Sequence, residues 1–454
     1  MKIRRNLTGV LAATAMAIPY ALLPSTAAAE IVQLELWARQ DTSGPLRAGN
    51  VMAAVERLNA ALAAEGSDTV VELTVNESPA GGFDDDALAL LRAFGIGKGP
   101  DLYVAAHEWI CVFADEGFAY DLTDHIAAYP VHYADIYENL WKSTECQGRR
   151  YAVPQDAEAR MFFYNKKLLR DAGYDNDFIE SMPDRVLAGE ITLDDISAIA
   201  KQVVDNTSAE YGIFHRPSKG PDYIMVFNSY GSSFLDSASG KLLLEPAKIE
   251  AAYGWFERNV AMGVTPGNNT SMEWGNIRDH FYANNNAAFW MYGIWDLGSE
   301  AFPRGVPSEK AAFFADWGWV ASPPAEIGGS PSSLTHPIVY AVSDVSDNKE
   351  LAARLIGFAS DADLNTAHAV TTTHLGIKTS QLDDPVYQAA WALAEAAQLL
   401  VFTKFMPNHA DFGALNAIIY QGLQGVEQGR LTAAEAAIFV VEEAQSQFDD
   451  VLVQ

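Results

Sequence analysis

Residues 31–37 read IVQLELW, and their apolar side chains alternate along the chain as they do in a β-strand. Residues 51–62 then repeat apolar side chains at helical spacing, and residues 70–75, VVELTV, form a second strand pattern. A second helical pattern covers residues 87–91, and residues 101–105, DLYVA, form a third short strand. Strand–helix–strand–helix–strand at this spacing predicts parallel βαβ units, so we expect an α/β protein.

The ends of these strands are the first candidates for a binding site. Ligands of open parallel sheets bind at the carboxyl ends of the strands. In this chain Trp37 and Arg39 lie at the end of the first strand, and His107, Glu108 and Trp109 follow the third. We therefore expect these five side chains to contribute to a site.

Helix-capping signals predict further helices in the second half of the chain. Thr192 precedes a helical pattern over residues 193–204 and has the side-chain oxygen that an N-cap requires. Thr432 and Glu435 form a capping box before residues 436–448. Both helices are expected to start at these threonines.

The composition excludes several classes of protein. The chain has 454 residues, with 30 Lys and Arg against 59 Asp and Glu, and a formal net charge of −29. Such a chain repels the phosphates of nucleic acid and the surface of an anionic membrane, so we expect neither as a partner. Its 49% hydrophobic and 20% charged residues are typical of a packed globular protein.

The first 29 residues have the three parts of a secretory signal peptide. A positive start with Lys2, Arg4 and Arg5 precedes a mostly apolar stretch, residues 11–23, and the small residues 27–29 form a cleavage site. Removing the three basic residues takes the net charge from −29 to −32. We expect a periplasmic protein without a lipid anchor, because no Cys lies at the cleavage site.

Two cysteines and nine histidines are the remaining candidates for special chemistry. Export permits a disulfide between Cys111 and Cys146, but the sequence leaves open whether they are bridged. The histidines are scattered, and neither a CxxC nor an HExxH motif occurs. We therefore expect no metal and no other cofactor.

Four stretches carry a resemblance to a known family. They are residues 100–103, PDLY; residues 151–169, YAVPQDAEARMFFYNKKLL; residues 284–295, NNNAAFWMYGIW; and residues 405–436, which begin FMPN. In this order and spacing, the chain resembles the extracellular solute-binding proteins of ABC importers, in the group that includes maltose-binding protein. The stretches extend over most of the chain that follows residue 29.

The resemblance implies a two-lobed periplasmic-binding-protein fold of the type II kind, in which hinge crossings join the lobes and each lobe is a mixed sheet flanked by helices. Lobe 1 would comprise residues 30–155 and 336–378, and lobe 2 would comprise residues 156–335 and 379–454. It further implies a monomer, not an enzyme, that captures an oligosaccharide or a glycoside between the lobes and delivers it to the permease subunits of an ABC transporter.

A sugar presents hydroxyls and apolar C–H faces, which polar side chains and aromatic rings satisfy. Four tryptophans are candidates for stacking, two tyrosines and a glycine for close approach, and the polar residues for hydrogen bonds. Asp156, Glu158 and Arg160 alternate, so in an extended segment they share a face. The full candidate set is Trp37, Arg39, His107, Glu108, Trp109, Asp156, Glu158, Arg160, Tyr230, Trp274, Tyr292, Gly293, Trp295, His336 and His374.

Other interpretations of these residues stay open at this point. The tryptophans are also ordinary core residues, and the alternating charges also suit a local ion pair. The acidic balance suits a polyamine or another cationic solute, given carboxylates and aromatic rings around it. A secreted glycoside hydrolase, with Asp156 and Glu158 as its carboxylates, is the third alternative.

Overall fold

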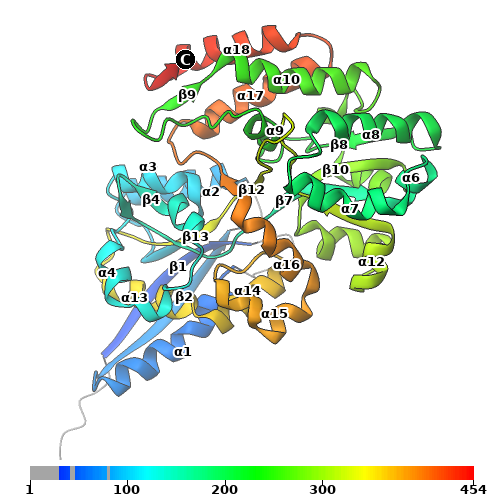
Figure 1. Cartoon of the computed structure of the whole chain (residues 1–454). Coiled ribbons are helices and arrows are strands. Elements are labelled where there is room, and N and C mark those ends of the chain that lie inside the picture. The colour runs from blue at the N-terminus through cyan, green and yellow to red at the C-terminus, as the bar shows by residue number, and fades with distance from the viewer. Residues whose placement is uncertain (1–29, 41–46, 79–81) are drawn as a thin grey trace, which may run out of the picture.

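The computed structural model describes residues 30–40, 47–78 and 82–454, so the predicted signal peptide lies outside the described residues. Two β-sheets, each flanked by helices, organise the molecule (Figure 1). We call each sheet with its helices a lobe. The first lobe contains β1, β2 and β13 in the lower part of the view, and the second contains β7, β8 and β10 in the upper right.

The sheet of the first lobe has the strand order β2-β1-β3-β13-β6. Strands β1, β2 and β3 are parallel, as the βαβ pattern predicts, and β13 is antiparallel to both β3 and β6. The elements that build this sheet are β1 (Glu30–Arg39), α1 (Gly49–Ala64), β2 (Thr69–Ser78), α2 (Phe83–Gly95), β3 (Leu102–Ala106), β6 (Val153–Pro154) and β13 (Ile338–Val342).

The pattern of burial explains why these elements form where they do. In β1 the buried side chains are every second residue, Leu34, Leu36 and Ala38. In α1 the buried positions recur at helical spacing, and Val51 and Leu58 are fully buried. The strand and the helix therefore present one apolar face each, and these faces pack together.

The sheet of the second lobe has the strand order β11-β7-β10-β8. Its central strands β7 and β10 are antiparallel to each other, and every side chain in both is buried. Helix α8 packs against this sheet, whereas α10, α17 and α18 pack against one another at the top of the view (Figure 1). The bounds are β7 (Arg160–Asn165), α8 (Leu193–Asn206), β8 (Tyr211–Phe214), α10 (Pro246–Ala261), β10 (Ala287–Gly293), β11 (Trp317–Val320), α17 (Phe412–Glu427) and α18 (Ala433–Gln447).

The chain passes between the lobes more than once. It runs from β6 to β7 through residues 155–159, and it returns from β12 (Ser333–Thr335) to β13. Strand β12 pairs with β14 (Thr403–Phe405), and a β-bridge joins Ala157 to Leu375. These adjacent segments form the connection between the two lobes.

The remaining elements complete the two lobes. Their bounds are α3 (Ile110–Asp115), α4 (Thr123–Ala128), α5 (Glu138–Trp141), β4 (Glu145–Cys146), β5 (Arg149–Arg150), α6 (Lys166–Asp171), α7 (Asn176–Leu187), α9 (Ile224–Ser229), β9 (Leu242–Leu244), α11 (Trp274–Arg278), α12 (Lys310–Asp316), α13 (Lys349–Ala359), α14 (Ala362–Thr372), α15 (Pro385–Ala389), α16 (Trp391–Ala396) and β15 (Val451–Val453). Among the described residues, no helix combines the length and the apolar character needed to cross a bilayer. Cys111 and Cys146 form a disulfide, which answers the question that the sequence leaves open.

Candidate functional site

A cavity of about 610 Å³ lies between the two lobes. From the first lobe it is lined by Arg39 at the end of β1, Phe83 and Asp84 at the start of α2, and Glu108 just after β3. The carboxyl ends of β1 and β3 thus both face the cavity, as expected for an open parallel sheet. The second lobe supplies the opposite wall, and His336 and His374 come from segments between the lobes.

The structure brings eight of the fifteen candidate residues together around this cavity. They are Arg39, Glu108, Glu158, Arg160, Tyr292, Trp295, His336 and His374. Their distribution over both lobes and the crossing segments matches the expected placement of a site between lobes. Their part in binding a ligand stays a prediction.

Three candidate tryptophans lie away from the cavity lining. Trp37 packs beside the first sheet, and its indole N–H donates to Glu35 Oε1 at 2.7 Å. Trp109 stacks on Phe113, with a distance of 6.5 Å between the ring centroids. Trp274 lies behind the lining residue Tyr292, 5.2 Å from it between ring centroids. These three rings pack against protein, which was the competing interpretation for each tryptophan.

Tyr230 and Gly293 also lie outside the cavity lining. The Tyr230 hydroxyl accepts a hydrogen bond from Arg258 at 3.4 Å and does not line the cavity. At Gly293 a Cβ atom would lie 1.8 Å from the ring of Trp295. The absence of a side chain at Gly293 therefore makes room for Trp295, and a backbone contact of Gly293 with a ligand stays a prediction.

Asp156 is fully buried behind the cavity. Its carboxylate pairs with Arg47 and lies 3.1 Å from His368 Nε2. Burial opposes ionisation of this carboxyl, but Arg47 and the neighbouring histidines outweigh that effect, and the pKa of Asp156 falls far below its ordinary value. Glu158, two residues further along this crossing segment, lines the cavity, whereas Asp156 does not.

A second buried network includes the two arginines of the opposite wall. Arg160 pairs with Glu158 at 2.5 Å and donates from Nε to Asp222 Oδ1 at 3.1 Å. Arg216, which follows β8, donates to the other oxygen of Asp222 at 3.0 Å. Asp222 is fully buried, so it holds both guanidinium groups in place at the edge of the cavity.

Glu158 and His374 connect this network to the crossing segment. His374 Nε2 lies 3.5 Å from Glu158 Oε1. Burial raises the pKa of Glu158, but Arg160 and His374 lower it more strongly, and the result is a pKa of about 2. Burial lowers the pKa of His374, but Asp156 and Glu158 outweigh it and raise the pKa above the ordinary value. Glu158 is therefore an ionised acceptor at neutral pH.

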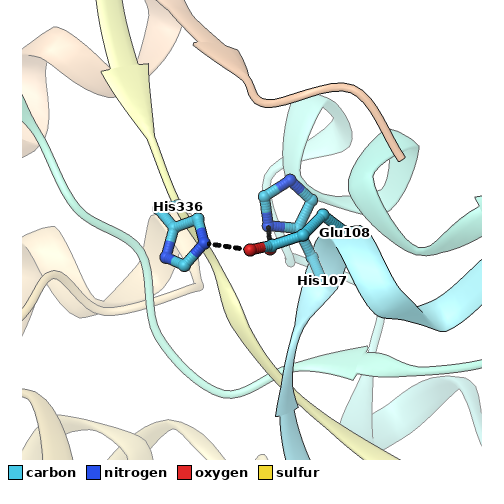
Figure 2. Close-up of side chains that lie close together, drawn as sticks. All are labelled: His107, Glu108 and His336. Atoms are coloured by element: carbon cyan, nitrogen blue, oxygen red, sulfur yellow. Dashed lines mark hydrogen bonds and ion pairs between the residues drawn. The ribbon is translucent and has the colours of Figure 1, made fainter. Parts of the chain in front are cut away.

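His107, Glu108 and His336 form a third cluster at the first-lobe wall. Figure 2 shows the Glu108 carboxylate between the two imidazoles. Its Oε1 lies 2.9 Å from His336 Nε2, and its Oε2 lies 3.4 Å from His107 Nδ1. Burial raises the pKa of Glu108, but His336 and His107 bring it down to about 2, whereas burial lowers the pKa of His107 to about 4.

His107 itself is buried beneath the lining residues, so of the three only Glu108 and His336 face the cavity. The scattered positions of the histidines in the sequence gave no sign of this cluster. Two histidines and one glutamate can hold a metal ion, and the donor atoms of these three residues all lie within 4.8 Å of one another.

Aromatic rings cover one part of the second-lobe wall. Trp295 lies edge-on to Tyr292 at 5.1 Å and nearly parallel to His374 at 6.1 Å, measured between ring centroids. The Arg160 guanidinium carbon lies 4.7 Å from the centre of the Trp295 ring. Trp295 is only partly buried, so it offers apolar surface to the cavity beside charged hydrogen-bonding groups.

Several lining residues were missed in the sequence. Arg216, Lys219 and Pro221 lie in the loop RPSKGP that follows β8, and Thr373 and Asn416 belong to the ends or faces of helices. A Pro- and Gly-containing loop directly after a strand is a signal that would have indicated the first group. No sequence pattern around Thr373 or Asn416 indicates that these two residues reach the cavity.

The charges around the cavity differ in sign from those of the whole chain. The lining includes five basic residues and three acidic ones, although the chain has a net charge of −29. The basic residues are Arg39, Arg47, Arg160, Arg216 and Lys219, and the acidic residues are Asp84, Glu108 and Glu158. The acidic composition of the whole chain, which suits a cationic solute, therefore does not extend to the residues that line the cavity.

Comparison with known proteins gives consistent similarities. The family model described as bacterial extracellular solute-binding protein matches residues 49–365. A maltotriose-binding protein of Pyrococcus abyssi is 22% identical over 365 residues, which are 78% of this chain and 70% of that protein. An arabinooligosaccharide-binding protein of Halalkalibacterium halodurans is 25% identical over 275 residues, which are 59% of this chain and 56% of that protein.

A solved structure shows the same fold. The sugar-binding protein MalE from Xanthomonas citri superposes with a TM-score of 0.73 at 18% identity, over 91% of this chain and 97% of that chain. Together with the two helix-flanked sheets, this similarity confirms the two-lobed α/β fold that the sequence predicts.

Proposed function

This chain belongs to the family of bacterial extracellular solute-binding proteins, and we propose that it captures a carbohydrate, an oligosaccharide or a glycoside, in the cavity between its lobes. The observation that carries the proposal is the second-lobe wall. There the Trp295 and Tyr292 rings lie beside Arg160 and Glu158, so apolar faces and fixed hydrogen-bonding groups are side by side. A sugar has both kinds of surface.

The cavity suits a carbohydrate better than a polyamine. A polyamine requires carboxylates that are not already paired with cations, and basic residues outnumber acidic ones in the lining. Glu158 is paired with Arg160, and Asp84 is paired with Lys219. In each pair the cation can still donate a hydrogen bond to a sugar hydroxyl, and the carboxylate can still accept one.

A glycoside hydrolase is also less suitable. Such an enzyme requires one carboxylic acid that stays protonated near neutral pH. The buried carboxyls in the lining, Glu108 and Glu158, both have their pKa lowered to about 2, and Asp156 does not line the cavity. We therefore propose binding without catalysis.

The protein would act outside the cytoplasm as a carrier. We propose that residues 1–29 direct export, that the exported monomer has no lipid anchor, and that it releases its sugar to the permease subunits of an ABC transporter. The names of the two curated relatives, which bind maltotriose and arabinooligosaccharide, support an oligosaccharide as the ligand. Lobe boundaries at residues 155/156, 335/336 and 378/379 remain part of this proposal, as does the absence of nucleic-acid binding.

A thermal-shift screen tests the proposal. Ligands that bind only the native state raise the melting temperature, so the purified exported chain is heated with maltodextrins, arabinooligosaccharides, polyamines and amino acids. We expect an oligosaccharide to give the largest increase. An increase with polyamines alone, or consumption of a glycoside during the assay, would refute carbohydrate capture without catalysis.

A further inference from the structure

The cluster of His107, Glu108 and His336 has features that sugar binding does not require. Its two histidines are 229 positions apart in the sequence and come together only in the fold. We propose that these three residues form a binding site for a divalent transition metal ion of the Zn²⁺ type. The two imidazole nitrogens and the carboxylate of Glu108 would be its protein ligands.

The positions of the donor atoms already match such a site. In a tetrahedral zinc site with bonds near 2.1 Å, neighbouring donor atoms are about 3.4 Å apart. Here His107 Nδ1 lies 3.4 Å from Glu108 Oε2, and His336 Nε2 lies 2.9 Å from Glu108 Oε1. The three side chains come from two different segments of the chain, and their donor atoms all lie within 4.8 Å of one another (Figure 2).

Two of these donor atoms are buried, and no hydrogen bond within the described part of the chain holds them. His107 Nδ1 and Glu108 Oε2 are buried from solvent, and neither forms a hydrogen bond with any described residue. Leaving buried polar atoms in this state costs free energy, and a metal ion would satisfy both at once.

The environment of His107 fixes the tautomer that a metal requires. Its Nε2 lies 3.0 Å from the backbone oxygen of Met406, so this nitrogen donates its proton to the carbonyl. The other nitrogen, Nδ1, then has a lone pair directed at the Glu108 carboxylate. Metal-binding histidines commonly donate their second ring nitrogen to a carbonyl in this way.

The ligand types favour a transition metal over Mg²⁺ or Ca²⁺. Two imidazoles and one carboxylate suit Zn²⁺, Ni²⁺ or Cu²⁺, whereas the harder ions prefer sites made of oxygen alone. Glu108 and His336 line the cavity, so the free coordination positions would face the bound solute. A metal with three protein ligands can accept an oxygen atom from a ligand in its fourth position.

The experiment titrates the metal alone, with no sugar present, so its result does not depend on the proposed function. The exported chain is stripped with EDTA, exchanged into buffer without chelator and titrated with ZnCl₂ or MgCl₂ by calorimetry, with melting temperature as a second measurement. We expect Zn²⁺ to bind with one site per chain and to raise the melting temperature, and Mg²⁺ to do neither. Co²⁺ as a substitute should give the visible absorption of a bound ion.

Glu108→Gln and His336→Gln locate the site. Each variant keeps a side chain of similar size and should weaken Zn²⁺ binding more than about 100-fold. Loss of a residue that only hydrogen-bonds to a metal ligand typically weakens binding ~10- to 100-fold, so a larger loss indicates a direct ligand. His132→Gln is the matched control, because His132 Nδ1 also lies beside a carboxylate, that of Asp361 at 2.7 Å, but outside the cavity. Circular dichroism checks that each variant is folded.

Two results would overturn the proposal. One is wild-type protein that binds no Zn²⁺ after stripping. The other is that the folded Glu108→Gln and His336→Gln variants still bind Zn²⁺, or that only the His132→Gln variant loses binding. In either case the metal would bind at another place in the molecule. If a variant fails to fold, the Co²⁺ spectrum of the wild type decides, because a surface ion exchanged with water lacks the absorption of an ion held by imidazoles.

Discussion

Lys219 donates from its Nζ to Asp84 Oδ2 at 2.6 Å, and this ion pair joins the two lobes at the cavity. Asp84 lies in the first turn of α2 in the first lobe, and Lys219 lies in the loop after β8 in the second. A contact of this kind forms only when the lobes are close together. It therefore belongs to the closed arrangement in which a solute would be held.

Asp84→Asn should accelerate release of the solute. Both side chains are more than one-third exposed, so the pair contributes less than about 1 kcal/mol to the free energy of unfolding. The loss should appear mainly as a higher dissociation rate, because fewer contacts hold the lobes together. Stopped-flow tryptophan fluorescence measures that rate.

Asp450→Asn is the control for this experiment. It removes the pair between Lys241 and Asp450, which has similar exposure and a length of 2.7 Å but lies away from the cavity. An equal change of dissociation rate in both variants would mean that the Asp84 pair has no specific role in holding the lobes.

Trp295→Ala should weaken binding of the solute about 10- to 100-fold, because it removes a partly exposed aromatic ring from the second-lobe wall. Calorimetry with the sugar identified by thermal shift measures the dissociation constant. Trp391→Ala is the control, since Trp391 is also partly buried but stacks on Trp319, and neither lines the cavity. Unchanged affinity in the Trp295 variant would remove the ring from the site.

Gly298→Ala should also weaken binding, for a steric reason. A Cβ atom at residue 298 would lie 2.7 Å from Thr373 Oγ1, and both residues line the cavity from different lobes. The added methyl group would therefore separate the lobes. Gly275→Ala, where a Cβ atom meets no atom within 4 Å, should leave the dissociation constant unchanged. Equal affinity of both variants for the sugar would contradict this steric explanation.

Asp296 should make stability depend on pH in a direction opposite to most carboxyls. Burial raises its pKa to about 6, and its pairing with Arg278 offsets only part of that effect. Between pH 4 and 6 the folded state therefore binds more protons than the unfolded state, so stability falls as the pH rises. The fall amounts to about 3 kcal/mol at most, from a shift of about two pKa units at 1.36 kcal/mol each.

The comparison of wild type with Asp296→Asn isolates this effect, because the other titrating groups are common to both. Urea unfolding at pH 4 and pH 7 gives the free energies. We expect the wild type to lose stability relative to the variant between these values. A wild type that gains stability relative to the variant would contradict the raised pKa.

The sequence predicted the fold well because the decisive signals are local. Alternating apolar residues in 31–37 define β1, and helical spacing in 51–62 defines α1. Thr432 and Glu435 form the expected capping box at the start of α18, with the Thr432 side chain accepting from the Glu435 backbone N–H at 3.2 Å. Each of these features depends on residues a few positions apart.

The site was predicted only in part because it depends on distant residues. The rule of strand ends correctly placed Arg39 and Glu108 at the cavity, but it did not distinguish Trp109, which turns toward Phe113. The alternation of Asp156 and Glu158 did not indicate which of the two lines the cavity, because both lie in the segment between the lobes and only Glu158 belongs to the lining. Contacts such as Asp84 with Lys219 arise from the closeness of the lobes, which no local pattern records.

A crystal structure of the chain with the sugar that most raises its melting temperature tests carbohydrate capture most directly. The account predicts sugar density in the 610 Å³ cavity, in contact with the Trp295 ring and within hydrogen-bonding distance of Glu158 or Arg160. Sugar bound on an outer surface of either lobe, with that cavity filled by water, would contradict it.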